Sequence, residues 1–470
     1  MTGPTLTLRA PADGSVLGEV PLTSREQVRA AVTRAQAAFR SGTWSAQAPR
    51  ARAERLHGLA DLMQRDAETL ARLDSEDAGK PITECRENDV PSAIESIRWF
   101  AEATDKGHGT TTPAGRDVVA FTEREPFGVV AAILPWNYPL AMAAWKIGPA
   151  LAAGNALLLK PADATPRSVL HVAELAREAG IPADVLQVVT GDGPTTGAAL
   201  ADDPIIGALS FTGSTTTGRG ILAAAAASNL KRVSLEMGGK SPQILLDDAR
   251  EFGDALIEGM IESAFLTSGQ NCTAGSRVLV HESIHDEVVA RLTGAAAALR
   301  VGHPADPATQ LGPVIDDRAA DRILAAVDTA VREGATLVTG GGEVDVVPGG
   351  RYLAPTVLTH VAPGSDITRR ELFGPVVTVQ SFRTRDEAIA LANDTEYGLA
   401  ASVWTTRLDD ALALARGVEA GLVSVGAYSE GDLTVPFGGW KQSGFGGVEK
   451  SFRAFEQWTR EKTVWIALRH

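Results

Sequence analysis

The stretch 266–277, LTSGQNCTAGSR, contains Cys272, one of only two cysteines in the 470 residues. Glycines and residues with amide side chains flank Cys272 in the sequence. Residues of these kinds are poorly suited to an apolar core. A cysteine held on such a loop can be exposed and activated by backbone dipoles. Cys85 lies in a polar helical segment, PITECREND, that offers no such framing. Cys272 is therefore the candidate nucleophile, with a buried small residue as the alternative interpretation.

A thiol nucleophile needs a base or a lowered pKa. No histidine lies in the glycine-framed motifs of this chain, which disfavours a Cys–His hydrolase, although a histidine distant in sequence could still be the partner. Glu236, in LEMGGK, ends an expected strand and precedes two glycines, so its carboxylate could face a cleft and activate a water molecule. The alternative for Glu236 is a salt bridge with Lys240 or another cation.

A third candidate is Asn137, which lies between Trp136 and Tyr138 in PWNYP, at the end of an expected strand. A fixed side-chain amide can donate a hydrogen bond to an oxyanion. An asparagine between two prolines is also a common turn former. Taken alone, the motif favours the turn, and only its combination with a nucleophile and a base suggests acyl chemistry.

The elements that must position these residues follow a clear alternation. From about residue 128, apolar strands (128–135, 155–160, 185–190, 206–211, 232–236) alternate with helices (140–153, 165–179), which predicts a parallel sheet covered on both faces. A second α/β block is expected to contain strands at 243–248, 277–281, 376–382, 399–404 and 421–425, and helices near 251–267, 284–299, 316–333, 385–393 and 407–417. Before both blocks, Thr23 or Ser24 can cap a first helix, and a second helical stretch runs from about 49 to 77.

Two segments could bind a dinucleotide. Phe211-Thr-Gly-Ser-Thr215 leaves a strand and starts a helix, so Gly213 and Ser214 could meet a pyrophosphate, or Ser214 could be an ordinary helix cap. Lys160 and Asp163 follow another strand and could hold a ribose, where the carboxylate favours NAD over NADP; a surface ion pair is the alternative. The motif GDGPTTG at 191–197 has one residue too many for a Rossmann phosphate loop and is weak evidence.

Composition sets broad limits on the protein class. A hydrophobic fraction of 44% with 22% charged residues is typical of a globular protein, and 470 residues suggest two or three domains. The net charge of −14 argues against nucleic acid or an anionic membrane as a partner. The absence of a long apolar run and of a signal sequence makes a cytoplasmic protein the expectation. Segments 110–124 and 459–468 read as exposed strands that need pairing, so an oligomer is expected.

Seven motifs in order, ILPWNYPL, LLKPAD, SFTGST, LEMGGKSP, GQNCTAGSR, ELFGPVV and PFGGWKQSG, resemble those of the aldehyde dehydrogenase superfamily over nearly the whole chain. The resemblance implies that Cys272 attacks an aldehyde to form a thiohemiacetal and that Asn137 and the Cys272 amide hold the oxyanion. Hydride transfer to NAD would leave a thioester, and Glu236 would activate the water that hydrolyses it. Acylating relatives generally lack this glutamate, so free acid is the implied product.

The same resemblance implies a cofactor cleft and no metal site. Glu371 would hold the nicotinamide ribose, Phe373 would pack near the nicotinamide, and Trp136 would line the cleft. The full set of implied cofactor residues is Lys160, Asp163, Gly213, Ser214, Trp136, Glu371 and Phe373.

The implied fold class is α/β, with a Rossmann-like cofactor domain, an α/β catalytic domain and a small β oligomerisation module. The cofactor domain would comprise residues 1–107 and 127–237, with 436–457 returning to it, and the catalytic domain 238–435. The module would comprise 108–126 and 458–470 and would build a homodimer or homotetramer.

The C-terminal motifs, together with IRWFAEATDKGHG, look like those of γ-glutamyl-γ-aminobutyraldehyde and related aminoaldehyde dehydrogenases. Tyr138, Trp145 and Tyr428 could form an aromatic box for an ammonium group, with Asp432 as counter-charge. Asn271, before the nucleophile, usually touches substrate in this family and departs from the residues commonly found there. Gly447 and Val448 replace a charged pair common in the family.

Three interpretations remain open at this stage. The first is an NAD-dependent aldehyde dehydrogenase acting on an aminoaldehyde or another ω-substituted aldehyde, with a broad-specificity aliphatic or semialdehyde enzyme as its variant. The second is a catalytically silent member used for binding or structure, against which the intact Cys272, Glu236 and Asn137 argue. The third is a cysteine hydrolase, which the cofactor motifs disfavour.

Overall fold

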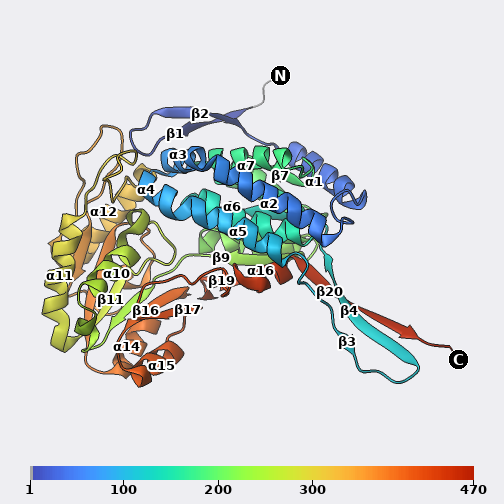
Figure 1. Cartoon of the computed structure of the whole chain (residues 1–470). Helices are drawn as coiled ribbons and strands as arrows, with labels where there is room; N and C mark the ends of the chain where they lie inside the picture. The colour runs from blue at the N-terminus through green and yellow to red at the C-terminus, as the bar shows by residue number, and fades with distance from the viewer. Residues whose placement is uncertain (1–3, 470) are drawn as a thin grey trace.

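Two sheets of mostly parallel strands organise the molecule (Figure 1). The computed structural model describes residues 4–469. The first sheet has the order β19–β9–β8–β5–β6–β7 and is parallel except for β19. Its strands are β5 (Val129–Ile133), β6 (Ala156–Lys160), β7 (Leu186–Val188), β8 (Ala208–Thr212), β9 (Arg232–Glu236) and β19 (Gly444–Phe445).

The burial of β5 shows why its sequence is apolar without alternation. Val130 and Ala132 pack into the core on one face of the sheet, and Val129, Ala131 and Ile133 pack into the core on the other. Both faces are therefore covered, as parallel sheets require. The helices of this half are α1 (Arg25–Arg40), α2 (Pro49–Arg65), α3 (Ala67–Ala78), α4 (Ile82–Glu84), α5 (Val90–Ala103), α6 (Pro139–Ala152), α7 (Arg167–Glu178), α8 (Ala198–Asp202), α9 (Thr215–Ala227) and α16 (Ser451–Gln457).

The second sheet has the order β12–β13–β14–β11–β10–β16–β17, and only its β12–β13 pair is antiparallel. Its strands are β10 (Pro242–Leu245), β11 (Arg277–His281), β12 (Thr336–Thr339), β13 (Thr356–Thr359), β14 (Val376–Phe382), β16 (Ala400–Trp404) and β17 (Leu422–Val425). Its helices are α10 (Asp254–Phe265), α11 (His285–Ala298), α12 (Asp317–Arg332), α13 (Asp366–Arg369), α14 (Arg385–Asn393) and α15 (Leu408–Gly417).

The expected alternation of strands and helices is confirmed in both blocks, and so is the cap of the first helix, where Ser24 and Gln27 form a reciprocal capping box. The stretch expected as one helix from about 49 to 77 is two helices, because Asp66 leaves the helical conformation at φ −98° and ψ 18°. The sequence analysis did not anticipate β12, β13 or the hairpin of β1 (Thr5–Arg9) and β2 (Val16–Pro21). It also placed Cys85 in a polar setting, whereas this thiol is fully buried.

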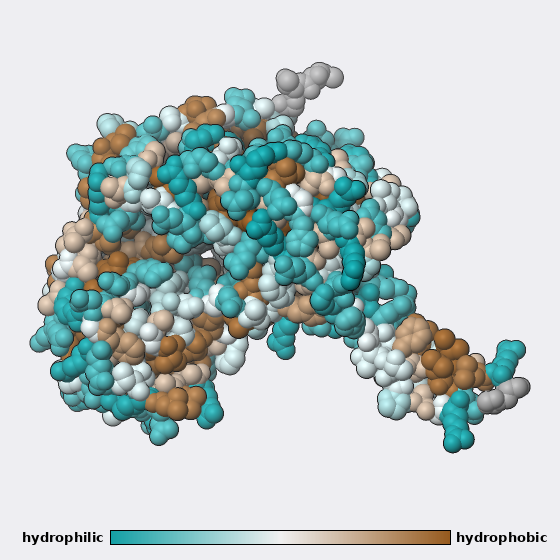
Figure 2. All heavy atoms as spheres, viewed as in Figure 1, coloured by the Kyte–Doolittle hydropathy of each residue, from teal (hydrophilic) through white to brown (hydrophobic). Residues whose placement is uncertain are grey.

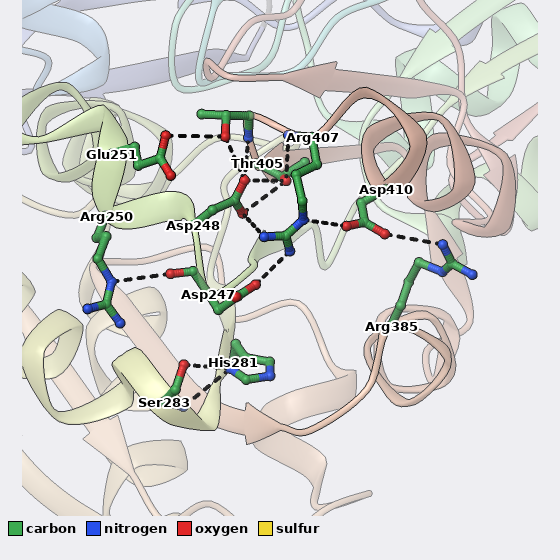
Figure 3. Close-up of polar contacts among 11 residues, drawn as sticks. Asp247, Asp248, Arg250, Glu251, His281, Ser283, Arg385, Thr405, Arg407 and Asp410 are labelled. Carbon is green, nitrogen blue, oxygen red and sulfur yellow. Dashed lines mark hydrogen bonds and ion pairs between the residues drawn. The ribbon is translucent and has the colours of Figure 1, made fainter.

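An ion-pair network ties the end of β10 to β16 and the helices beside it (Figure 3). Arg407 lies between Asp247 and Asp410, at 2.6 Å from a carboxylate oxygen of each. Asp248 accepts hydrogen bonds from the Thr405 hydroxyl at 2.9 and 3.0 Å. The network fixes the turns that follow the carboxyl ends of β10 and β16, and its residues do not line the cavity described below.

A three-stranded arm projects from the body (Figure 1). It pairs β4 (Val118–Pro126) with β20 (Thr459–Ala467) over nine residue pairs and with the short β3 (Thr111–Thr112). Trp465 is 66% exposed, and Ile466 and Val119 face each other across the two strands and are also exposed. Figure 2 shows apolar atoms gathered on this arm. Exposed apolar side chains on a sheet edge favour pairing with another chain.

No helix among the described residues is long and apolar enough to cross a bilayer.

We expect Trp465→Glu to convert an oligomer of two or four chains into a smaller assembly, because a carboxylate would have to be desolvated where the arm packs against another copy. Light scattering after size-exclusion chromatography measures the mass directly. Leu408→Glu, at another exposed apolar position (71% exposed) on α15, is the matched control and should leave the mass unchanged. A monomeric wild-type protein would contradict the expected assembly.

Candidate active site

A cavity of about 900 Å³ opens at the carboxyl ends of the first sheet. Four neighbouring parallel strands end in residues that line it: Leu134 after β5, Lys160 at the end of β6, Thr212 at the end of β8 and Glu236 at the end of β9. Ligands bind at this edge in open α/β sheets because the strand ends and the following loops diverge there. The remaining walls come from the loops of the second half, which bring Cys272 to the same cavity.

Backbone strain holds the nucleophile loop in place. Thr267 and Ser268 adopt φ of +52° and +56°, which non-glycine residues rarely do. Gly269 follows at φ +69°, and a Cβ there would lie 2.3 Å from the carbonyl oxygen of Gly374. Only glycine fits at this position, so the loop presses against 374–375 and turns Cys272 into the cavity. The glycine in LTSGQNC thus allows the backbone to turn tightly and to pack closely against the neighbouring loop.

Asn137 lies next to this loop. Its side-chain amide is buried and donates from Nδ2 to the Gln270 carbonyl oxygen at 2.9 Å. That bond uses one of the two Nδ2 hydrogens. The other hydrogen remains for an oxygen atom formed beside Cys272, two residues further along the chain, and both residues line the cavity. The structure therefore brings the expected oxyanion donor and the expected nucleophile together.

The surroundings of Cys272 favour the protonated thiol over the thiolate. Burial raises the pKa of Cys272 well above its usual value, and the carboxylates of Glu430, Glu371 and Glu236 raise it further. No histidine lines the cavity within the described residues. The proton that must leave Cys272 before it attacks can therefore only be accepted by a carboxylate or by water.

Glu236 is the carboxylate suited to that role. Its two oxygens are buried and accept no side-chain hydrogen bond from any residue that the structure describes, and only the backbone amide of Gly439 lies close enough to act on the carboxylate. Burial raises the pKa of Glu236 well above its usual value; the neighbouring Glu449 raises it further, and Lys146 opposes this. The alternative salt bridge with Lys240 is not formed, because the Lys240 ammonium is also buried without a partner, and burial lowers its pKa to about 7. A carboxylate in this state can take up and release protons.

Behind Glu236 lies a fully buried ion pair between Lys146 of α6 and Glu449 of the loop before α16. One oxygen of Glu449 accepts from Lys146, and the other has no partner among the described side chains and backbone. Glu449 also lines the cavity. This pair links the C-terminal segment to α6, in addition to the pairing of β19 with β9 in the first sheet.

The opposite part of the cavity has the features of a dinucleotide cradle. Ser214 caps α9 by accepting from the Thr217 amide at 3.3 Å, so the first amides of a thirteen-residue helix face the cavity. A Cβ at Gly213 would lie 2.5 Å from the Phe211 ring, so only glycine fits there. Lys160 is buried and donates only to the Pro161 carbonyl, at 3.1 Å. Desolvation lowers the pKa of Lys160, so an oxygen-rich ligand would relieve its burial.

Asp163, Glu371, Trp136 and Phe373 line the same part. Glu371 accepts from the Gly239 amide at 3.0 Å, and burial raises its pKa to about 7. The Trp136 and Phe373 rings meet edge to face at 5.4 Å. The GDGPTTG motif is mostly structural: Asp192 caps the turn Gly193–Gly197, and of this motif only Gly193 reaches the cavity lining.

The four aromatic and amide residues expected in the substrate pocket, Tyr138, Trp145, Asn271 and Tyr428, also line the cavity. Two of the aromatic faces already carry cations of the protein itself. The Lys80 ammonium lies 3.7 Å from the Tyr138 ring centroid, and that of Lys450 lies 4.8 Å from the Trp145 centroid. The idea of an aromatic box open to a substrate ammonium therefore needs correction at these two rings.

Asp432 was expected as the counter-charge in this pocket, but it does not line the cavity. Its carboxylate is exposed and accepts from the amide and hydroxyl of Thr434 at 2.7 and 2.6 Å. Glu430, two residues earlier, lines the cavity instead. Sequence reasoning missed Glu430, although the segment YSEGD carries both carboxylates, because the turn at Gly431 (φ +67°) decides which one faces inward.

Comparisons with known proteins agree with this geometry. The model of the aldehyde dehydrogenase family matches residues 2–464. The chain belongs to this family. It is 44% identical to the aminoacetaldehyde dehydrogenase of Pseudomonas aeruginosa over 464 residues, which are 99% of this chain and 92% of that protein.

Two solved structures show the same fold. The γ-glutamyl-γ-aminobutyraldehyde dehydrogenase of Burkholderia cenocepacia J2315 is 46% identical, with a TM-score of 0.95 over 99% of this chain and 94% of that one. An indole-3-acetaldehyde dehydrogenase complexed with NAD⁺ is 42% identical, with a TM-score of 0.96 over 99% and 93% of the two chains. The expected membership of the aldehyde dehydrogenase superfamily and the expected fold class are thus confirmed.

We expect Lys146→Met to lower the free energy of unfolding by about 3–5 kcal/mol, because the methionine leaves the buried Glu449 carboxylate without its cation. Urea unfolding followed by tryptophan fluorescence measures the change. Arg383→Met, which removes one partner of the exposed Arg383–Glu282 pair, is the control and should cost less than about 1 kcal/mol. Equal effects of the two substitutions would contradict the structural role of the buried pair.

Proposed function

We propose that this protein oxidises an aldehyde to the free carboxylic acid with NAD, and that its preferred substrate carries an amino or another ω-substituent. The observation that supports this most is the single cavity in which a thiol, a side-chain amide and an unpaired carboxylate lie beside a dinucleotide cradle. The names of two relatives, an aminoacetaldehyde and a γ-glutamyl-γ-aminobutyraldehyde dehydrogenase, support the aminoaldehyde preference.

The residues of the cradle fit NAD. Lys160 and Asp163 would hold the adenosine ribose, Gly213 and Ser214 the pyrophosphate, and Glu371 the second ribose. Lys160 has ammonium hydrogens to offer, and the helix N-terminus at Ser214 offers backbone amides. NAD, when bound, supplies the hydride acceptor for the oxidation.

The first half of the reaction forms a bond to sulfur. Because the thiol is protonated, Glu236 in its ionised form accepts the Cys272 proton, directly or through a water molecule, and the sulfur attacks the carbonyl carbon. The carbonyl electron pair moves to oxygen, where Asn137 Nδ2 and the Cys272 backbone amide donate hydrogen bonds. The thiohemiacetal that results loses hydride to leave a thioester on Cys272.

The second half breaks that bond. Glu236 first passes the proton taken from Cys272 to solvent. It then accepts a proton from the attacking water, the hydroxide adds to the thioester carbonyl, and the same two donors hold the oxyanion. Collapse expels the Cys272 sulfur and releases the acid. The net change converts aldehyde, water and oxidised cofactor into acid, reduced cofactor and a proton. Glu449 and Lys146 adjoin Glu236 and can help to disperse the charge that it gains and loses.

We also propose an assembly, a domain division and a compartment for the protein. The arm built from 108–126 and 458–470 would form the homodimer or homotetramer, the three domains would divide as expected, and the protein would act in the cytoplasm. A broad-specificity aliphatic or semialdehyde enzyme is the competing assignment within the same chemistry.

The function is tested by NADH formation with purified protein across aminoacetaldehyde, 3-aminopropanal, succinic semialdehyde, propanal and hexanal. We expect kcat/KM for the amino-substituted aldehydes to exceed that for the others about tenfold, equivalent to about 1.4 kcal/mol of transition-state binding. A flat profile or a preference for propanal or hexanal would support the aliphatic assignment. Ester hydrolysis without NADH would support a hydrolase, and neither activity would support a silent member.

We expect Glu236→Gln to form about one equivalent of NADH per active site in a burst slower than that of wild type, because only water is then left to accept the Cys272 proton. The steady rate that follows should lie about 10²-fold or more below wild type, because glutamine cannot deprotonate the hydrolytic water either. Stopped-flow absorbance records both phases. In the wild type the steady rate should rise with pH, since the raised pKa of Glu236 keeps part of it protonated at low pH, and this dependence should weaken in the variant. Cys272→Ala is the control without a burst.

A further inference from the structure

The loop after β17 places in the cavity a carboxylate, Glu430, that forms no ion pair with any described residue. Glu430 Oε1 accepts from the Asn271 amide at 3.3 Å, from the Tyr428 hydroxyl at 3.2 Å, and from the Thr273 hydroxyl. All three donors are neutral and converge on one oxygen. Glu430 Oε2 receives no hydrogen bond from any residue in 4–469, and Glu430 lines the cavity.

Lys450 forms no ion pair with the Glu430 carboxylate among the described residues, although the two charges attract, since Glu430 opposes the lowering of the Lys450 pKa by burial. Lys450 donates from Nζ to the backbone carbonyls of Glu430 and Gly431, each at 3.1 Å. Its ammonium also lies 4.8 Å from the Trp145 ring centroid and 5.3 Å from that of Phe437. It is therefore committed to holding the backbone of the loop, and within the described chain Glu430 forms no ion pair.

The other charged side chains around this end of the cavity do not supply a counter-ion either. Lys80 forms ion pairs with Asp89 and Glu84 and covers Tyr138. Glu262, at the end of α10, lines the cavity and carries the same charge as Glu430, which helps to raise the pKa of Glu262. A half-buried carboxylate beside a second one favours a cationic ligand.

The position of Glu430 relative to the nucleophile limits the length of that ligand. Two of its hydrogen-bond donors, Asn271 and Thr273, are the residues immediately before and after Cys272. Since consecutive Cα atoms are only about 3.8 Å apart, a molecule bound between Cys272 and Glu430 spans a short distance. A carbonyl at the sulfur and a cation at Oε2 must therefore be separated by few carbons.

We propose that Glu430 is a specificity-determining residue whose Oε2 binds the ammonium group of a short ω-aminoaldehyde while Cys272 attacks its carbonyl. This inference rests on the proposed function and adds to it the residue that recognises the amine and a preference for short chains. The hydrogen bonds from Asn271, Thr273 and Tyr428 orient the carboxylate, and Lys450 fixes the loop that carries it.

The test compares isosteric pairs in which –NH₃⁺ replaces –CH₃: aminoacetaldehyde with propanal, and 3-aminopropanal with butanal. In Glu430→Gln, we expect kcat/KM for each aminoaldehyde to fall at least about tenfold, or about 1.4 kcal/mol, mainly through KM. Loss of a charge that raises the pKa of Cys272 acts on both members of a pair alike, whereas only the aminoaldehyde loses an attraction to the carboxylate. The ratio of kcat/KM for the aminoaldehyde to that for its neutral partner should therefore fall at least about tenfold. Activity on the neutral aldehyde reports directly that the variant is folded.

Asp432→Asn is the matched control, because it removes the same charge from the same loop at an exposed position outside the cavity. It should leave both ratios within about twofold of wild type, as screened surface charges act weakly. Glu430→Asp keeps the negative charge but places it farther from Cys272, because the aspartate side chain is one methylene shorter. This variant should still prefer amino-substituted aldehydes, and its preference should shift toward the longer one, 3-aminopropanal.

The outcomes separate the two proposals. If the wild type oxidises the aldehydes but the ratios in Glu430→Gln equal those of wild type, the role of Glu430 is overturned while the proposed function stands. Equal losses on the neutral partners also overturn it, since Glu430 would then act only in shaping the loop. If the wild type forms no NADH from any of the four aldehydes, the proposed function fails, and the inference fails with it.

Discussion

Parallel strand register is the constraint on which the site depends. Ile133 pairs with both Lys160 and Phe211, and Thr212 pairs with Glu236, so four strands end at one level. The residues that follow them, from the asparagine after β5 to the helix cap after β8, therefore reach one cavity without a long loop. A slip by one residue would turn every side chain of a strand to the opposite face, and both faces of this sheet are filled by helices.

The cavity around the nucleophile is rich in acids and poor in free cations. Glu236, Glu371 and Glu430 all raise the pKa of Cys272, and the nearest ammonium behind Glu236 is committed to Glu449. Burial raises the pKa of both Cys272 and Glu236, so the site favours the protonated forms of these two groups. Catalysis in such a cavity moves protons between neighbouring groups. A cation that binds there, on the cofactor or on the substrate, has a large effect on the reactivity of the Cys272 thiol.

The sequence predicted most of the strands, the helix cap at Ser24 and the residues that line the cavity, because local periodicity and short motifs determine them. It failed where contacts between distant segments decide the outcome. Lys80 over Tyr138 and Lys450 over Trp145 join segments far apart in the chain, and no local pattern indicates them. Glu430 and Asp432 look equivalent in sequence, and only the path of one glycine turn distinguishes them. The roles of the site residues themselves rest on chemistry that remains to be measured.

The C-terminal segment that closes the cavity has a consequence for the order of synthesis. Phe437 and Glu449 line the cavity, Lys450 holds the loop of Glu430, and the same segment supplies β19, α16 and then β20 of the arm. A chain emerging from the ribosome presents Cys272 long before these residues exist. Domains fold as they emerge, so during translation Cys272 lies in a cavity that still lacks the walls formed by Phe437 and Glu449. The cavity is therefore complete only when the chain has been made as far as α16, directly before the strand β20 that pairs with β4 in the projecting arm.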